Sequence, residues 1–244
     1  MSVLSRFRII AMSEKKAATH ELIERATPDF DFFFMVALAV IMACVGMMQG
    51  SETVVIGSML IAPMLYPVLS VSLGLATGDL GILRRSLATL GNATLLSIGV
   101  GLVAGLFGAA QPVAHLLTPE IIFRTEPTLF SLAVAVVSGL AVAYALMRPR
   151  LSETLAGIAI SVSLIPPLAV VGLGLAWFNL PVAVGALAVF LLNIAGIIAA
   201  ALIVFALTDL KGMDREAHEA VKEEEERIRK ETAKLEKLDK IETA

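Results

Sequence analysis

The sequence predicts an all-α polytopic membrane protein, with six transmembrane helices arranged as two inverted three-helix repeats and a charged cytoplasmic C-terminal helix. The first observation is composition: 57% of the 244 residues are hydrophobic and 17% are charged, whereas soluble domains carry about 25% charged residues. The second is that charges gather after Asp209 and leave long uncharged runs before it. The third is that motifs recur at a spacing of 99 to 101 residues, as Arg25 and Arg124 or Asn92 and Asn193 show.

The same composition excludes several classes of protein. The single cysteine, Cys44, cannot form a disulfide framework or a metal site made of several thiolates. Basic residues form no face or stripe outside the tail, so a nucleic-acid partner is not expected. The run from His20 to Glu24 lacks the second histidine of a zinc-protease helix, and no nucleophile with its base indicates hydrolysis within the bilayer. We therefore expect no enzyme activity, metal site or cofactor.

Charge and hydropathy divide the chain into five segments. The N-terminal segment lacks the cleavage site of a removable signal peptide, so we expect it to stay attached, either as a short amphipathic segment ending at Pro28 or as a frayed terminus. The predicted segments are residues 1–31, cytoplasmic; 32–108, the first three-helix repeat; 109–127, an extracytoplasmic loop; 128–208, the second, inverted repeat; and 209–244, the charged cytoplasmic tail.

Uncharged runs of about 20 residues mark the membrane spans, because a bilayer core about 30 Å thick needs a helix of that length. The last run is too long for one crossing and contains a turn from Trp177 to Pro181, so it counts as two spans. The predicted spans are Phe32 to Met48, Thr53 to Gly78, Ser86 to Pro119, Pro127 to Met147, and two within Thr154 to Thr208.

Lysine and arginine near the span ends orient the protein, because these residues are retained on the cytoplasmic side. The N-terminal segment, the loops after spans two and four, and the tail carry nearly all of them. The opposite loops carry only Arg124. We therefore expect both termini in the cytoplasm.

The two halves of the membrane region repeat one another. Each copy contains three spans, so the second copy enters the bilayer from the opposite side and is inverted. Inverted halves are a recurring plan among transporters, with the path at their interface. The corresponding residues are Arg25 and Arg124, Pro28 and Pro127, Ser51-Glu52-Thr53 and Ser152-Glu153-Thr154, Pro67 and Pro167, Leu73 to Ala76 and Leu173 to Ala176, and Asn92 and Asn193.

Spans two and five carry prolines deep in apolar sequence. These are Pro63 and Pro67 in the first repeat and Pro166 and Pro167 in the second. Proline removes a backbone donor, and in lipid the freed carbonyl needs another partner. Two interpretations stay open: the prolines form ordinary kinks, or they break both helices and mark a substrate or ion path.

Polar residues at matching positions extend this candidate path. Glu52 and Glu153 begin spans two and five, where they either cap the helix or form acidic mouths on opposite faces. Asn92 and Asn193 lie at depth in spans three and six, where they either tie helices together or line the path. The remaining path candidates are Ser161 and Ser163.

With these motifs, the chain resembles the family catalogued as domain of unknown function 389, hydrophobic membrane proteins of bacteria and archaea. The resemblance runs from Arg25 to Leu207. It implies a multi-pass protein of the prokaryotic cytoplasmic membrane. The residues that carry it are Gly57-Ser58-Met59-Leu60-Ile61-Ala62-Pro63 with Pro67, Arg124-Thr125-Glu126-Pro127, and Leu164-Ile165-Pro166-Pro167 followed by Gly172-x-Gly174.

The tail and one glycine motif bear on assembly. Glu223 with Arg227 and Glu226 with Lys230 are spaced for ion pairs on a helix, which forms either a solvated extension or a coil between copies. The motif Gly101-x-x-x-Gly105 favours close helix packing, within one chain or in a homo-oligomer.

The inverted duplication favours an integral membrane transporter or channel for a small solute or ion. In this hypothesis the path lies at the interface of the repeats, beside the proline-broken helices. The alternative is a non-conducting membrane scaffold or regulator that binds a cytosolic partner through its charged C-terminal tail.

Overall fold

The structure, a computed structural model, describes residues 10–109, 117–148, 151, 164–208, 219–224, 226–230, 232 and 234. The secondary structure of these residues is helical, as predicted. Residues 219–224 also form helix. The helices are α2 (Met12–Arg25), α3 (Phe30–Gln49), α4 (Glu52–Ile61), α5 (Leu65–Thr77), α6 (Leu80–Gly108), α7 (Pro119–Ile122), α8 (Leu129–Leu146), α10 (Ile165–Ala176) and α11 (Leu180–Leu207).

Four helices, α3, α6, α8 and α11, are long and apolar enough to cross a membrane. The pair α4 and α5 passes the same test together and bends by 51° at a short break, which raises the number to five. Helix α10 is apolar but has only 12 residues. The described part of the chain is therefore that of a membrane-embedded protein, whereas six spans and inverted repeats stay predictions. The first part of predicted span five, residues 154–163, lies outside the described residues.

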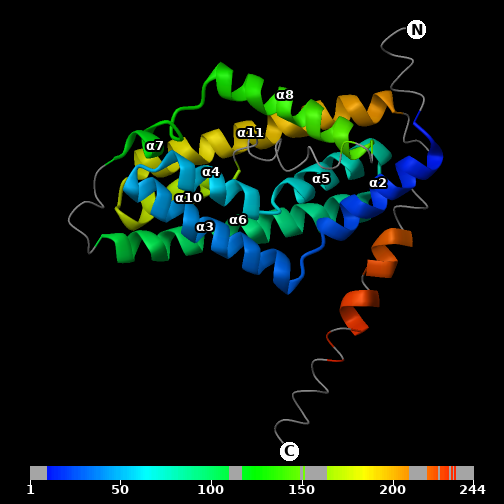
Figure 1. The fold of residues 1–244 in the computed structure, drawn as a ribbon, viewed down its shortest axis with the longest axis horizontal. Coiled ribbons are helices and arrows are strands. Elements are labelled where there is room, and N and C mark those ends of the chain that lie inside the picture. Colours follow the sequence, from blue (N-terminus) through cyan, green and yellow to red (C-terminus); the bar gives the residue numbers. More distant parts are fainter. Residues whose placement is uncertain are drawn as a thin grey trace, which may run out of the picture.

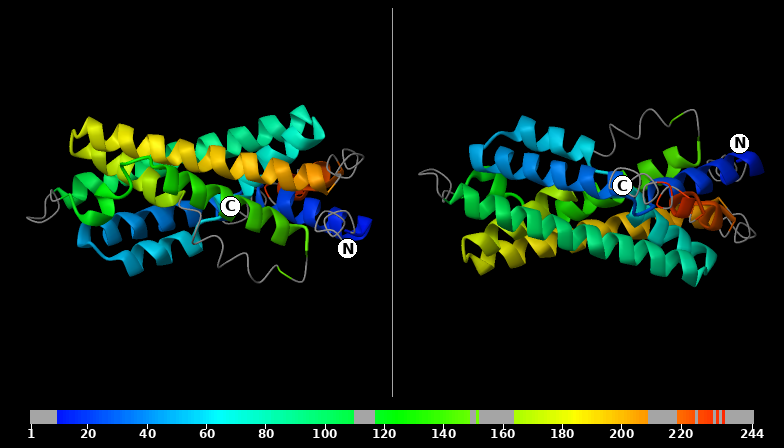
Figure 2. Two further views of the ribbon diagram at one scale, coloured as in Figure 1. Left: turned by 90° about the horizontal axis from the view of Figure 1, so that it is seen from above. Right: turned by 90° about the horizontal axis from the view of Figure 1, so that it is seen from below.

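The two short helices α5 and α10 form the buried centre of the bundle. Residues 67–74 of α5 and 164–174 in and before α10 are all buried. Helix α10 packs against α6, α11 and α3, while α5 packs against α6 and α11. Figure 1 shows the long helices running alongside this pair, and Figure 2 shows the same arrangement from above and below. A helix that is apolar on all sides is stable only where neighbours cover it.

The prolines begin helices rather than kink them. Pro63 lies in the break between α4 and α5, and Pro67 is the third residue of α5. Pro166 and Pro167 are the second and third residues of α10. Backbone N–H groups in a first helical turn have no partner within the helix, so proline there removes no helical hydrogen bond. Of the two interpretations of span two, the structure therefore shows a broken helix.

The hairpins that follow α5 and α10 share their local geometry. Gly78 and Phe178 both adopt a left-handed conformation, with φ of 76° and 54°. The next residue caps the following helix in each case: Asp79 accepts from the N–H of Gly81 at 2.7 Å, and Asn179 accepts from the N–H of Val182 at 3.3 Å. Gly78 and Asp79 thus form the same kind of turn as Phe178 and Asn179, 100 positions later. These two pairs were not among the repeated motifs found in the sequence.

Glycines set the closest approach between α6 and α10. A Cβ built on Gly172 would lie 2.6 Å from Cα of Gly101, and one built on Gly105 would lie 2.6 Å from Cβ of Ala176. The indole N–H of Trp177 donates to the Gly105 carbonyl at 3.2 Å. Of the two interpretations of Gly101-x-x-x-Gly105, the structure shows packing within one chain.

The tail docks on α2. Ala220 packs with Ile23 of α2 and Ile82 of α6. Two polar contacts join the tail to α2: a hydrogen bond between His20 and Glu223 at 3.2 Å and an ion pair between Arg227 and Glu24 at 3.1 Å. Residues 219–224 lie with α2 and the ends of α8 and α11 at one end of the molecule, opposite α7 (Figure 1). The predicted tail helix is thus present here, and it contacts the body of the protein.

Candidate functional site

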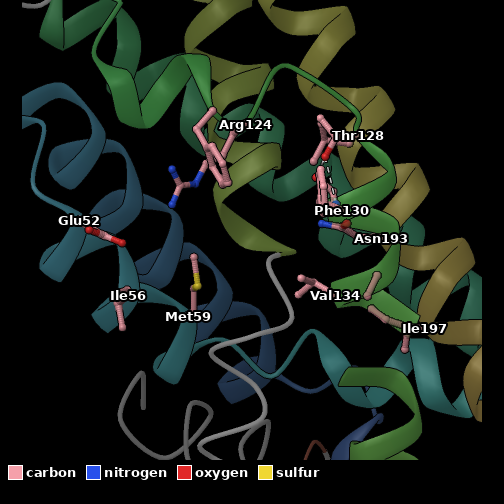
Figure 3. A pocket seen from close by; sticks show the side chains of 13 residues that line it. Glu52, Ile56, Met59, Arg124, Thr128, Phe130, Val134, Asn193 and Ile197 are labelled. Carbon is pink, nitrogen blue, oxygen red and sulfur yellow. Dashed lines mark hydrogen bonds between the residues drawn. The ribbon is translucent and has the colours of Figure 1, made fainter. Parts of the chain in front are cut away.

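A cavity of about 490 Å³ lies near the starts of α4 and α8, with α11 as its third wall. Most of its lining side chains are apolar, which is usual for pockets that hold small molecules. Figure 3 shows Glu52 and Asn193 on opposite sides of the cavity, with Arg124 between them. The polar side chains of the lining are Glu52, Arg124, Thr128, Ser131 and Asn193.

Arg124 is the buried charge of this cavity. It lies in the turn after α7, and its side chain is 9% exposed. Its Nη1 donates to the carbonyl of Glu120 at 2.6 Å and to the carboxylate of the same residue at 2.7 Å. Its Nε is buried and has no hydrogen-bond partner. A buried donor without an acceptor costs about 1 to 3 kcal/mol, so this atom favours an acceptor from a molecule in the cavity.

The start of α8 supplies two hydroxyl groups. Thr128 caps this helix and accepts from the N–H of Ser131 at 3.1 Å. The two hydroxyl oxygens lie 2.9 Å apart and share a hydrogen bond. The cap fixes where α8 begins, since it satisfies a backbone donor of the first turn, and it places both hydroxyls at the rim of the cavity.

Close packing of α8 on α11 holds Asn193 in place. A Cβ built on Gly139 would lie 2.9 Å from Cα of Ile197, and one built on Gly196 would lie 2.9 Å from Cβ of Ala135. The two glycines thus let the helices approach on either side of one interface. Asn193 is buried, 7% exposed, and lines the cavity next to this contact.

Glu52 is the first residue of α4 and faces the cavity from the opposite wall. The preceding residue, Ser51, makes no capping hydrogen bond through its side chain, so that part of the predicted cap is not seen. Among the described residues no ion pair to Glu52 is found. Its carboxylate is therefore available to a ligand.

The structure brings together two of the residues predicted for the site, Glu52 and Asn193. Asn92, predicted as the equivalent of Asn193, is exposed on α6 and does not line this cavity. The predicted path prolines lie elsewhere: Pro67, Pro166 and Pro167 are buried at the centre, and Pro63 is half-buried in the break. The predicted residues Glu153, Ser161 and Ser163 lie outside the described residues.

Sequence reasoning missed the part of the site around Arg124, which we expected only as an outlying basic residue and repeat marker. One signal in the printed sequence points to it. Glu120 precedes Arg124 by four residues, as Glu21 precedes Arg25, and both pairs form ion pairs in the structure. The repeated unit is therefore Glu-x-x-x-Arg-x-x-Pro. Among the described residues, no group of three or more His, Cys, Asp or Glu side chains is arranged to hold a metal ion.

Comparison with known proteins gives two similarities. The family model described as Domain of unknown function (DUF389) matches residues 59–199. An uncharacterized protein of Methanocaldococcus jannaschii is 29% identical over 171 residues, which cover 70% of this chain and 52% of that protein. The chain thus spans about half the length of that relative. No solved structure matches the chain significantly.

Proposed function

The chain belongs to the family described as Domain of unknown function (DUF389), and we propose that it is an integral membrane transporter or channel for a small solute or ion. The path lies at the interface of two inverted three-helix repeats. One observation carries this proposal. The cavity draws Glu52, Ile56 and Met59 from the first predicted repeat and its remaining lining from the loop and the second repeat, and transporters of this plan bind substrate at such an interface.

Paired local geometry supports the inverted arrangement. The left-handed residues and caps after α5 and α10 recur 100 positions apart, and the ion pairs of Arg25 and Arg124 recur 99 positions apart. Helix α5 packs against α11, and α10 packs against α6, so each short central helix contacts the long helix of the other half. This exchange is what two halves related by an axis in the membrane plane would produce.

The proposed location is the prokaryotic cytoplasmic membrane, with both termini in the cytoplasm. The positions of lysine and arginine support this orientation, as does the docking of the tail on α2, which places these two elements at one end of the molecule. In this orientation the cavity, which is lined by Glu52 at the start of α4 and by Arg124 after α7, lies toward the extracytoplasmic face.

Flux through the purified full chain in liposomes, over a panel of ions and small solutes, tests the proposal. Val134→Trp fills the cavity from α8, whereas Val103→Trp adds the same bulk on α6 away from it. The two valines are matched controls because they are 51% and 50% exposed. We expect Val134→Trp to abolish flux and Val103→Trp to retain it.

Two results would contradict the proposal. Flux no greater than that of protein-free liposomes over the whole panel excludes conduction of these solutes. Equal flux by wild type and Val134→Trp excludes the cavity as the path. A Pro67→Ala, Pro167→Ala double variant tests separately whether the helix starts at the centre contribute to flux.

The exposed part of the tail supports the alternative, a non-conducting scaffold or regulator with a cytosolic partner. Glu226 and Lys230 keep 72% and 80% of their side chains exposed, and such charges are available to another protein. Deleting residues 212–244 separates the two functions. The scaffold predicts loss of partner recovery with an intact membrane core, whereas the transporter predicts that flux persists.

A further inference from the structure

We propose that the cavity binds a zwitterion with an apolar body, whose oxyanion contacts Arg124 and whose ammonium group contacts Glu52. This inference rests on the proposed function, because it names the substrate class of the same site. The oxyanion is a carboxylate or a phosphate. The chemistry is therefore that of an amino acid or of an ethanolamine phospholipid headgroup.

The free edge of the Arg124 guanidinium defines the oxyanion end. Nη1 is occupied by both oxygens of Glu120 that it contacts, at 2.6 and 2.7 Å. Nε and Nη2 share the other edge of the planar group and make no hydrogen bond among the described residues, and Nε is buried. Two parallel N–H groups on one edge match the two oxygens of a carboxylate or phosphate. Arg124 thus has one edge fixed by the protein, while its other edge has no protein acceptor. On that second edge a ligand reaches Nη2 first, because Nε has almost no accessible surface.

Pairing of the individual charged groups, and not the net charge, favours a zwitterion over a simple anion or cation. Arg124 contributes one positive charge, Glu120 one negative charge and Glu52 one negative charge, so these three groups sum to −1. An anion would be repelled by this net negative charge and would leave the Glu52 carboxylate without a positive partner. A cation would compensate Glu52 but leave the Arg124 Nε without an acceptor. A zwitterion satisfies both groups at once.

The remaining lining suits an apolar body between or beyond the two charged groups. Ile56, Met59, Val134 and Ile197 supply apolar walls from α4, α8 and α11. Phe123 and Phe130 at the rim are largely exposed. A volume of about 490 Å³ lies within the range of pockets that enclose small organic ligands, roughly 300 to 1,000 Å³.

Three soluble probes with nearly the same apolar body separate the charge classes. Leucine carries both charges, 4-methylpentanoate lacks the ammonium group and 3-methylbutylamine lacks the carboxylate. Titration calorimetry with the purified full chain in detergent is expected to show leucine binding at least about tenfold more tightly than either analogue, since each analogue loses a charge-assisted contact. Arg124→Lys keeps the charge beside Glu120 but removes the free edge, and Glu52→Gln removes the carboxylate; each is expected to weaken leucine binding by about tenfold.

Arg25→Lys and Glu126→Gln are matched controls, because neither residue lines the cavity, and both are expected to bind leucine as wild type does. Equal thermal unfolding of Arg124→Lys and wild type shows that any loss of binding is local.

A second experiment, with lipids, distinguishes a free amino acid from an ethanolamine phospholipid headgroup as the ligand. The protein is placed in nanodiscs of phosphatidylglycerol with or without phosphatidylethanolamine, and retained lipid is measured by native mass spectrometry. Retention of phosphatidylethanolamine that Arg124→Lys and Glu52→Gln both abolish identifies a lipid headgroup as the ligand. Leucine binding that phosphatidylethanolamine does not reduce identifies a free solute. Either result supports the zwitterion.

The inference is overturned if neither leucine nor phosphatidylethanolamine binds, or if 4-methylpentanoate binds as tightly as leucine and Glu52→Gln has no effect. These outcomes are distinct from those of the flux assay. Flux of another solute without zwitterion binding leaves the transporter and removes the substrate class. Zwitterion binding without any flux leaves the site and removes transport.

Discussion

Two turns of the molecule share one motif and differ in what covers them. Arg25 is the last residue of α2 and Arg124 follows α7, and each arginine pairs with the glutamate four residues before it. The Arg25 side chain is 55% exposed and lies over the ring of Tyr66. The Arg124 side chain is 9% exposed and lines the cavity. The same local chemistry thus anchors a surface helix at one end and presents a donor to a pocket at the other, because burial is decided by the surrounding helices.

The corresponding asparagines of α6 and α11 also differ in burial, and again the residue of the second half is the more buried one. Asn193 of α11 is buried beside the cavity, whereas Asn92 of α6 is exposed. If the halves are related as proposed, these two corresponding positions therefore differ in burial.

The largest expected effect is the difference in stability lost when each of the two arginines is replaced by alanine. Arg124→Ala leaves the carboxylate of Glu120, 20% exposed, without its partner. We expect the free energy of unfolding to fall by about 2 to 3 kcal/mol, somewhat less than for a fully buried pair. Arg25→Ala breaks an exposed pair and is expected to cost at most about 1 kcal/mol. Thermal unfolding of both variants in detergent measures the difference, and equal losses would show that burial does not distinguish the turns.

The two hairpins are expected to respond to substitution with opposite signs. Gly78→Ala adds a Cβ to a residue with φ of 76° and is expected to destabilise the protein by about 1 kcal/mol. Phe178→Gly relieves the left-handed conformation of a non-glycine residue, and its exposed ring loses few contacts. We expect a gain of roughly 0.5 kcal/mol, because the greater freedom of glycine in the unfolded chain offsets part of the relief. Destabilisation by both variants would contradict this view of Phe178.

Replacing the asparagines gives a smaller difference. Asn193→Ala removes a buried polar side chain from the α8 and α11 interface and is expected to cost about 0.6 kcal/mol, as polar contacts between membrane helices do on average. Asn92→Ala is expected to leave the unfolding temperature in detergent unchanged. A larger cost for Asn92→Ala would show that α6 makes a polar contact with another copy, and crosslinking of the wild type would then detect it.

The smallest expected effect concerns the docked tail. Burial raises the pKa of Glu224, as do the carboxylates of Glu24 and Asp29, while Arg227 and Arg85 oppose the rise. The docked tail therefore holds this proton more tightly than the free tail does. Docking is favoured at pH below the ordinary range of a carboxyl group and weakens as the pH rises through the raised value.

Spin-label distances between α2 and the tail test this pH dependence. In the wild type the distance between α2 and the tail is expected to increase as the pH rises through the raised pKa of Glu224. In Glu224→Gln this increase is expected to be absent over the same pH range. An unchanged pH profile in Glu224→Gln would assign the effect to another group.

The sequence predicted the elements well where hydropathy alone decides them. Helix α3 begins two residues before the predicted span and ends one residue after it. The turn predicted from Trp177 to Pro181 separates α10 from α11 at residues 177–179, while Leu180 and Pro181 already belong to α11. Proline positions indicated the break in span two, but a proline in an apolar run does not reveal whether a helix bends or ends. That outcome depends on the packing of α5 at the centre.

The site was predicted only in part, because a cavity is defined by residues from helices that the sequence does not place side by side. Glu52 and Asn193 were found as isolated polar residues in apolar runs. Arg124 was used only as an outlying basic residue, a repeat marker and part of a family motif, since nothing in its own segment shows that it lines a cavity with residues of α4, α8 and α11. The recurrence of the glutamate four residues before each arginine was the available signal.

The joint at residues 62–64 has a mechanical consequence for the pocket. Helix α4 has ten residues, so it is about 15 Å long, and no continuous ladder of main-chain hydrogen bonds ties it to α5. A swing of about 10° about that joint would carry its far tip, where Glu52 is located, through roughly 2.5 Å. This distance separates a direct contact from one bridged by water, so the conformation of residues 62–64 determines how close Glu52 lies to the opposite wall of the cavity.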